Sequence, residues 1–404
     1  MKILFISFFV PYPPVAGHLQ RNYNLIREIS RDNEIYLVTF NQKVLLPTKK
    51  QIDDGIKELK KYCEYVRIFD MPCQMSPLKW YAYLFFNLFS ATPLTAWKFY
   101  SKELIEEIKK LIVSHDFDLV HIDTVDIARY SELTGDIPTA LNHQNVESIL
   151  TRRRAANVKN PLAKFYIFLQ SYKLRRYEKL YLGKFDVNLC VSQIDIENFK
   201  KMVPDARYEI VANGTDIQYF SPGDDNDVSQ RLIFAGGMSW HPNADAMEYC
   251  AGEIFPIVKR EFPDAFMDII GSHPPAGLKS YSQKDSHIIV HGFVDDIRAY
   301  MARAAVYVVP IRVGGGTRLK ILDALACGKA VVSTSIGCEG LDVTPEENIL
   351  IGDTPEEFAG QVIRLLRDSD LRKKLQRNGR KLVENKYAWE IIGAQLNRIY
   401  RSIL

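Results

Sequence analysis

The sequence lacks an apolar run long enough to span a membrane, a strong net charge and any clustered cysteines. A formal net charge of +3 over 404 residues gives no case for a nucleic-acid partner. The six cysteines are scattered, with no Cys-x-x-Cys pair and no nearby histidine cluster. This usage predicts a reduced, cytoplasmic protein without structural zinc. What remains is an ordinary globular composition on a chain long enough for two domains, each with its own core.

The N-terminus has the charge and the apolar run of a short signal peptide, Met1-Lys2 followed by Ile3 to Val10. It passes directly into Pro11-Tyr12-Pro13-Pro14, however, without a small-residue cleavage site. We therefore expect residues 2–10 to form a buried first strand.

Short apolar strands alternate with amphipathic helices along the whole chain, which predicts an α/β protein with parallel sheets. The strands are expected at residues 2–10, 34–40, 118–122, 138–141, 186–191, 208–212, 231–235, 266–270, 288–290, 306–310 and 330–333. Between two of them, the polar stretch Ser221 to Ser229 is typical of a linker. We expect an N-terminal domain at 1–215 with a helix at 387–404, and a C-terminal domain at 226–386.

The rest of the chain is organised around Tyr307 to Thr334, in which a buried strand runs into Gly314, Gly315 and Gly316 before a helix opens. Glycines let a backbone approach a ligand closely, and the first amides of a helix are free to bind an anion. Thr317, Arg318 and Lys320 follow at once, and Asp323 lies on the second helical turn. The cluster favours a phosphate site over the alternative, a tight turn beside two solvated basic residues.

This segment resembles the retaining GT-B glycosyltransferases of family GT4, which carry a Glu, seven residues, a second Glu and then Ala-Met-Ala-x-Gly-x-Pro-Val-Val. Here Asp323 matches the second acid and is followed by Ala324-Leu325-Ala326-Cys327-Gly328-Lys329-Ala330-Val331-Val332, while Gly315 replaces the first. The resemblance implies two Rossmann-like, doubly wound domains facing a cleft, with a C-terminal helix that crosses back to the N-domain. It also implies transfer of a sugar from a UDP-sugar or GDP-sugar without cofactor or metal.

The resemblance assigns roles in the C-terminal domain. Asp323 would hold the ribose, and the loop Gly314 to Thr317 would hold the diphosphate together with Gly237. The backbone at Phe293 would contact the base. Many family members carry an Arg and a Lys where this chain has Gly237 and Pro242. Because a diphosphate needs counter-charge, we expect Arg318 and Lys320 to supply it and to act in catalysis.

Three residues of the N-terminal domain match the family pattern, and a fourth candidate lies beside one of them. Gly17 and Arg21 lie in the loop after the first strand, where the family approaches the donor diphosphate or the acceptor. A proline-rich turn is the alternative for both. His143 and Asn145 follow the strand at 138–141, at the carboxyl end where ligands of parallel sheets gather. The resemblance makes His143 catalytic at the sugar, with loop capping as the alternative, and we place Arg21 and Asn145 at the acceptor.

Two segments of the N-terminal half stand out by composition. Residues 76–100 are unusually aromatic, and we expect the helix from Trp80 to Phe89 to lie in the core rather than at an interface. Residues 151–184 hold ten basic residues and the single acid Glu178, interleaved with aromatics. This pattern favours peripheral contact with an anionic membrane at its inner face over a solvated helix face.

The expected function is a retaining glycosyltransferase that acts on a glycan or lipid-linked acceptor in cell-surface polysaccharide or glycolipid synthesis. A nucleotide-sugar epimerase of the same fold is an alternative, since it would use the same donor site. A non-catalytic subunit that binds the donor or a membrane is another, because Gly315 replaces an acid.

Overall fold

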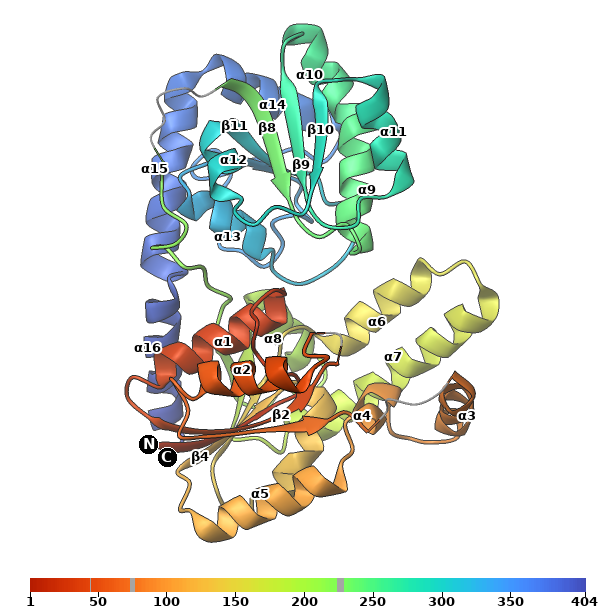
Figure 1. Ribbon diagram of the computed structural model, residues 1–404, viewed down its shortest axis with the longest axis vertical. Coiled ribbons are helices and arrows are strands. Elements are labelled where there is room, and N and C mark those ends of the chain that lie inside the picture. Colours follow the sequence, from red (N-terminus) through yellow and green to blue (C-terminus); the bar gives the residue numbers. More distant parts are fainter. Residues whose placement is uncertain (44, 73–76, 224–228) are drawn as a thin grey trace. The chain divides into compact units, whose positions relative to one another are not determined.

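The computed structural model describes residues 1–43, 45–72, 77–223 and 229–404. Contacts divide the chain into unit 1, residues Met1–Ala212 with Ile392–Leu404, and unit 2, residues Asn213–Ile391. The expected start of the second domain at residue 226 falls on residues 224–228, outside the described residues, as does Cys73. Each unit is an α/β layer structure (Figure 1).

Unit 1 alternates strands and helices, as the sequence predicts. Its strands are β1 (Lys2–Ser7), β2 (Glu34–Asn41), β3 (Tyr65–Asp70), β4 (Leu119–Asp123), β5 (Thr139–Asn142), β6 (Val187–Cys190) and β7 (Tyr208–Ile210). Its helices are α1 (Gly17–Ile29), α2 (Lys49–Leu59), α3 (Pro77–Leu88), α4 (Leu94–Lys98), α5 (Lys102–Ser114), the 3-10 helix η1 (Val125–Leu133), α6 (Glu147–Ala156), α7 (Pro161–Leu182) and α8 (Gln193–Lys200).

The described strands of unit 1 form one parallel sheet in the order β3-β2-β1-β4-β5-β6-β7. The central strand β1 pairs with β2 through Ile3 and Ile35, and with β4 through Ile3 and Leu119. All three side chains are completely buried. Continuous apolar runs of this kind are expected where helices cover both faces of a parallel sheet.

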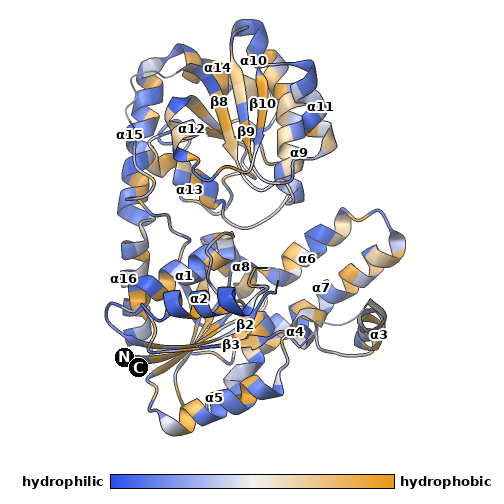
Figure 2. Ribbon diagram, viewed as in Figure 1, coloured by the Kyte–Doolittle hydropathy of each residue, from blue (hydrophilic) through white to orange (hydrophobic). Residues whose placement is uncertain are grey.

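Unit 2 repeats this plan. Its elements are β8 (Ser229–Ala235), α9 (His241–Tyr249), the π-helix η2 (Cys250–Ile254), α10 (Phe255–Glu261), β9 (Phe266–Ile270), α11 (Ala276–Lys284), β10 (Ile288–Gly292), α12 (Arg298–Arg303), β11 (Ala304–Val309), α13 (Leu319–Ala326), β12 (Ala330–Ser333), β13 (Leu350–Ile351), α14 (Pro355–Arg367) and α15 (Ser369–Lys386). The described strands form a parallel sheet in the order β10-β9-β8-β11-β12-β13. Strands such as β8 and β10 are strongly hydrophobic (Figure 2). The α/β, GT-B-like fold class is thereby confirmed.

The last helix, α16 (Trp389–Arg401), ends in unit 1. Tyr400 is buried there, and its hydroxyl lies 2.6 Å from Nδ1 of His121, which is itself buried in β4. Asn397 contacts Asn33, with 2.8 Å between the amide groups. The return of the chain's C-terminus to the first unit, implied by the family resemblance, therefore rests on specific contacts of α16.

Residues 151–184 form parts of two helices rather than one. The break has a local cause, because Asn160 caps α7 by accepting hydrogen bonds from the amides of Leu162 and Ala163, and Pro161 occupies the first helical turn. Proline is tolerated there but would remove a hydrogen bond inside a continuous helix.

Candidate functional site

The strand order of unit 2 reverses between β8 and β11, because later strands are added on both sides of β8. In open α/β sheets the loops that leave the carboxyl ends of the strands at such a point form the ligand crevice. The loop after β8 contains Gly236 and Gly237, and the loop after β11 contains the three glycines. The glycine cluster predicted from the sequence thus lies at the expected ligand edge of this sheet.

The triple-glycine loop has a backbone that only glycine adopts readily. Gly314 has φ +118° and Gly316 has φ +80°. The guanidinium of Arg318 folds back and donates hydrogen bonds to the carbonyls of Gly315 and Gly316. Because this arginine holds the loop carbonyls, it fixes the loop's shape while its charge stays beside the first turn of α13.

Lys320 lies in a tight polar and aromatic niche. Its ammonium donates to Oδ1 of Asn243 over 2.7 Å and lies 4.1 Å from the ring centre of Phe234. A Cβ atom at Gly236 would come within 2.5 Å of this ammonium. Burial, then the positive charge of Arg318, lowers the Lys320 pKa to about 7, against the opposing effect of Asp323. An anion bound here would restore the full charge.

Asp323 is half-buried on α13, and its Oδ1 accepts a hydrogen bond from Oγ1 of Thr215 over 2.5 Å. Burial raises the pKa of its carboxyl to about 7. Asn213, two residues before Thr215, makes a similar contact. Its Nδ2 donates a hydrogen bond to Oγ1 of Thr317 over 2.6 Å. The segment around Asn213 therefore positions two of the predicted donor residues.

The loops after β8, β9 and β10 are joined by backbone hydrogen bonds. Gly236 donates to Ile270, and Gly271 donates to Gly292, over 2.9 and 2.8 Å. Phe293 follows directly and is 74% exposed, as a ring that stacks on a ligand needs to be. The predicted residue Gly237 has more room than Gly236, since a Cβ there would approach Ser272 Oγ only to 3.8 Å.

The strand order of unit 1 reverses in the same way, between β1 and β4, and a buried amide and carboxylate network occupies that edge. Asp123, the last residue of β4, accepts hydrogen bonds from the side-chain amides of Asn22, Asn142 and Gln144 over 2.5, 2.8 and 3.2 Å. Burial raises the pKa of Asp123, against the lowering effect of these donors. Thr124 has φ +77°, a strained value for a threonine.

The structure places Arg21 in the interior of unit 1 rather than at an acceptor. Its guanidinium is fully buried and donates to the carbonyls of Val211 and Ala212 and to Oδ1 of Asn142 over 2.7, 2.8 and 2.9 Å. Burial lowers its pKa to about 10, so that it stays charged at neutral pH. Its role is to tie α1 to the end of the sheet.

His143 is also buried, against the expectation that it faces a sugar. Its Nε2 lies 3.1 Å from Oδ1 of Asn188, and its ring lies 4.5 Å from that of Phe199. Burial lowers its pKa to about 4, so the ring is neutral at pH 7. Asn145 is half-buried, and Gly17 is an exposed residue at the start of α1.

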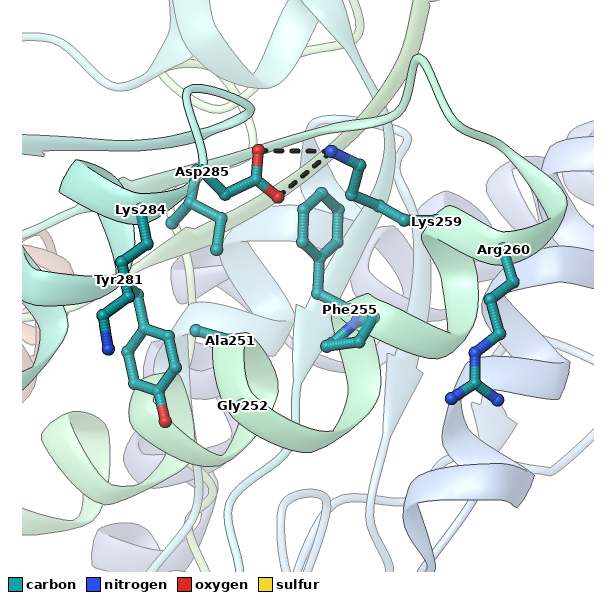
Figure 3. Close-up of a pocket in the computed structure, with 10 residues that line it drawn as sticks. Ala251, Gly252, Phe255, Lys259, Arg260, Tyr281, Lys284 and Asp285 are labelled. Atoms are coloured by element: carbon teal, nitrogen blue, oxygen red, sulfur yellow. Dashed lines mark hydrogen bonds and ion pairs between the residues drawn. The ribbon is translucent and has the colours of Figure 1, made fainter.

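A hollow of about 450 Å³ in unit 2 lies away from these loops (Figure 3). It is lined in part by Tyr281 and Lys284 and reaches Ile288, the first residue of β10, at the opposite edge of the sheet from the glycines. Its Lys259 is paired with Asp285 over 3.1 Å. The hollow is therefore separate from the predicted donor residues.

No three His, Cys, Asp or Glu side chains gather as a metal site within the described ranges. None of the helices described has both the length and the apolar character needed to cross a bilayer. Cys63, Cys190, Cys250, Cys327 and Cys338 are buried free thiols.

Comparison with known proteins gives a family match within unit 2. Residues 229–368, which include the glycine loop and Asp323, match the family model described as glycosyl transferases group 1. The matched stretch is about a third of the chain.

Among curated relatives, this protein is 22% identical over 399 residues to an uncharacterized 44.6 kDa protein in the cps region of Klebsiella pneumoniae, with 96% of each chain covered. It is 23% identical to a phosphatidyl-myo-inositol mannosyltransferase of Mycolicibacterium smegmatis, with 74% of each chain covered.

Solved structures share the whole fold. A sucrose-phosphate synthase of Thermosynechococcus elongatus matches with a TM-score of 0.70 at 17% identity, covering 100% of this chain and 98% of that one. Anabaena HepE in complex with UDP-glucose matches with a TM-score of 0.62 at 15% identity, with both chains covered completely.

The structure brings together Gly314 to Thr317, Arg318, Lys320 and Asp323 at one edge of unit 2. Sequence reasoning missed Gly236, Asn243 and Asp123. The signal for Asp123 was its place at the end of the strand expected at 118–122, since the carboxyl end of a parallel strand is a ligand position. No sequence pattern pointed to Asn243, which contacts Lys320 from a different helix.

Proposed function

We propose that this protein is a group 1 glycosyltransferase, a retaining, metal-independent enzyme that moves a hexose from a nucleotide-diphosphate sugar to a glycan or lipid-linked acceptor. The observation that carries the proposal is the convergence of Arg318, Lys320 and the helix-opening amides of α13 at the ligand edge of unit 2. Two positive groups and a helix N-terminus suit a diphosphate without a further cation.

The remaining groups fit the other parts of such a donor. Asp323 lies on α13 and accepts a hydrogen bond from the hydroxyl of Thr215. Its carboxylate would also accept hydrogen bonds from the ribose hydroxyls. The exposed ring of Phe293 offers a surface for the base. A relative in Corynebacterium glutamicum, 25% identical over 237 residues, is named as GDP-mannose-dependent, and Anabaena HepE was solved with UDP-glucose. We therefore expect UDP or GDP as the nucleotide.

The reaction proceeds at the anomeric carbon of the donor sugar. Its bond to the β-phosphate oxygen breaks, an acceptor hydroxyl bonds to the same face of the sugar, and the hydroxyl proton passes to the departing diphosphate. Negative charge grows on that diphosphate in the transition state, where Arg318 and protonated Lys320 stabilise it. The acceptor would bind at unit 1, at the carboxyl ends of its parallel strands.

The free thiols suit a reducing cytoplasm, in which we place the reaction. The relative from the Klebsiella cps region supports cell-surface polysaccharide synthesis as the setting. The same chemistry applies to a glycolipid acceptor.

Two experiments test the proposal, one after the other: a screen for the donor and then a measurement of turnover. A thermal-shift screen with UDP, GDP, ADP and their sugars identifies the donor, and turnover is then measured for Arg318→Ala against Arg260→Ala, an exposed arginine of the same unit. We expect Arg318→Ala to lower kcat by about 100-fold, the usual effect of losing one preorganised donor, and Arg260→Ala to leave it unchanged. Equal activity of the two variants would remove the assigned role.

Two results would redirect the assignment. Consumption of donor without acceptor and without release of nucleotide would identify an epimerase. Tight donor binding in calorimetry, with neither transfer nor slow hydrolysis, would identify a non-catalytic subunit, as Gly315 in place of an acid would permit.

A further inference from the structure

Three helices of unit 1 form a structure that we call the arm, residues 77–89 and 147–182. The helices α6 and α7 pack against each other and extend together from the sheet of unit 1, and α3 lies beside them (Figure 1). Arg152 of α6 lies over the ring of Phe168 of α7, 5.9 Å from its centre.

Asn87, which is completely buried, attaches α3 to α7. Its Oδ1 accepts hydrogen bonds from Gln170 over 2.9 Å and from Tyr166 over 3.3 Å. The buried ammonium of Lys173 donates to the carbonyl of Asn87 over 2.5 Å. These contacts hold the aromatic helix at a fixed place on the arm, so its exposed rings belong to a built surface rather than to a loose segment.

The arm exposes aromatic side chains that the sequence predicted to lie in the core, and that prediction is wrong. Half of the large hydrophobic side chains that are exposed among the described residues belong to the arm. They are Tyr81, Phe85, Phe86, Phe89, Leu162, Phe165, Phe168, Tyr172 and Leu180. A monomer in water has no reason to keep so many rings exposed on neighbouring helices, which marks the surface as an interaction site.

The same surface is positively charged. The exposed basic residues of α6, α7 and their flanks are Arg152, Arg153, Arg154, Lys159, Lys164, Arg175, Arg176, Lys179 and Lys184. The acidic residue between positions 148 and 184 is Glu178. Its side chain is completely buried and accepts a hydrogen bond from the backbone amide of Ser148 over 3.0 Å. Lys184 pairs with Glu132 over 3.3 Å, and between residues 148 and 183 the exposed charged side chains are all basic.

Aromatic rings mixed with lysine and arginine suit the boundary between lipid headgroups and acyl chains. The rings enter the boundary, while the long basic side chains reach the headgroup phosphates. Polar and apolar residues follow one another along both α6 and α7 (Figure 2). We propose that the arm docks this protein on an anionic lipid surface.

The docking is independent of the assigned chemistry, because the residues of the arm are distinct from the donor residues of unit 2. Asn87 and Lys173 act as positioning residues, since they orient α3 rather than meet the lipid.

Co-sedimentation with vesicles tests the charge of the arm. The full chain is mixed with vesicles of phosphatidylcholine alone or with added phosphatidylglycerol, at low and high salt. We expect binding that needs phosphatidylglycerol and falls with salt. Lys164→Glu/Lys179→Glu should weaken it at least about tenfold, whereas Lys109→Glu/Lys110→Glu, an equal charge change on the exposed face of α5, should change it less than about twofold.

A second pair of variants tests the rings. Phe85→Ser/Phe165→Ser should lower vesicle binding about fivefold or more, while Val113→Ser, at an exposed apolar position of α5, should not. Binding that is indifferent to phosphatidylglycerol and salt, or equal losses in the α5 controls, would overturn the proposal. So would self-association in sedimentation velocity that Phe85→Ser/Phe165→Ser abolishes, without any lipid binding. None of these readouts depends on sugar transfer, so their failure leaves the proposed function standing.

Discussion

In both units the strand order of the parallel sheet reverses at one point. The side chains at the carboxyl ends of the strands there are basic in unit 2, whereas in unit 1 they are a carboxylate and neutral amides. In unit 2 that edge carries glycines, Arg318 and Lys320. In unit 1 it carries Asp123 and a set of side-chain amides. The fold therefore fixes where this edge lies, while the residues that follow each strand decide which charged and polar groups stand there.

Two arginines sharpen this contrast, because each follows a glycine that lies after a strand. Arg21 lies four residues after Gly17, and its guanidinium donates hydrogen bonds to backbone carbonyls inside unit 1. Arg318 follows Gly316 and holds the loop that faces the ligand edge of unit 2. The same local sequence order thus ties elements together inside unit 1 and shapes a glycine loop in unit 2.

The largest expected effect is on the stability of unit 1. Arg21→Ala would leave two backbone carbonyls and Asn142 without their donor, and should lower the free energy of unfolding by about 3–5 kcal/mol. Protection from hydrogen exchange in unit 1 measures this. Arg31→Ala, at an exposed arginine after the same helix, is the control. A loss of stability in Arg318→Ala as large as that in Arg21→Ala would remove the contrast.

Buried carboxyl groups give unit 1 a pH dependence. Burial raises the pKa of Glu178 to about 7, so between pH 4.5 and 7 the folded state keeps a proton that the unfolded state releases. The free energy of unfolding therefore falls as pH rises through this window. Glu178→Gln should recover on the order of 1–3 kcal/mol at pH 8 and little at pH 4.5. Denaturation at both pH values tests this, with exposed Glu103→Gln expected to show no such difference.

In unit 2, two adjacent glycines should differ. A methyl group at Gly236 would displace the ammonium of Lys320 from Asn243, whereas one at Gly237 meets nothing closer than 3.8 Å. We expect Gly236→Ala to weaken the binding of a nucleoside diphosphate about tenfold and Gly237→Ala to weaken it less than about threefold. Calorimetry measures both. The reverse order would mean that Gly237, and not the niche of Lys320, limits access to the donor.

The smallest expected effect is the pH dependence of donor binding. The Lys320 pKa of about 7 means that positive charge is lost as pH rises through neutrality, and Asp323 gains negative charge over the same range. Nucleotide affinity should fall about threefold between pH 6 and 8.5. Lys320→Met should reduce the slope, and Lys320→Met/Asp323→Asn should remove it. An unchanged slope in the double variant would assign the titration to other groups.

The sequence predicted the alternation of strands and helices well, because fully apolar runs such as Val306 to Val309 have few alternatives to a buried parallel strand. It predicted the triple-glycine loop and Asp323 as one cluster, because these residues are adjacent in the chain. It failed for the helix from Trp80 to Phe89, since an all-round apolar helix looks the same whether its rings are covered by protein or exposed on an arm.

By itself, the sequence determined the two α/β units, the glycine loop and the positive charge beside it, all of which depend on local order along the chain. The tertiary structure alone decided that Arg21 and His143 are buried, that Asn243 and Gly236 frame Lys320, and that Asp123 joins amides from two other segments. These outcomes depend on contacts between residues far apart in the chain. Composition and periodicity carry no information about which distant side chains will meet, because packing of whole elements sets those distances.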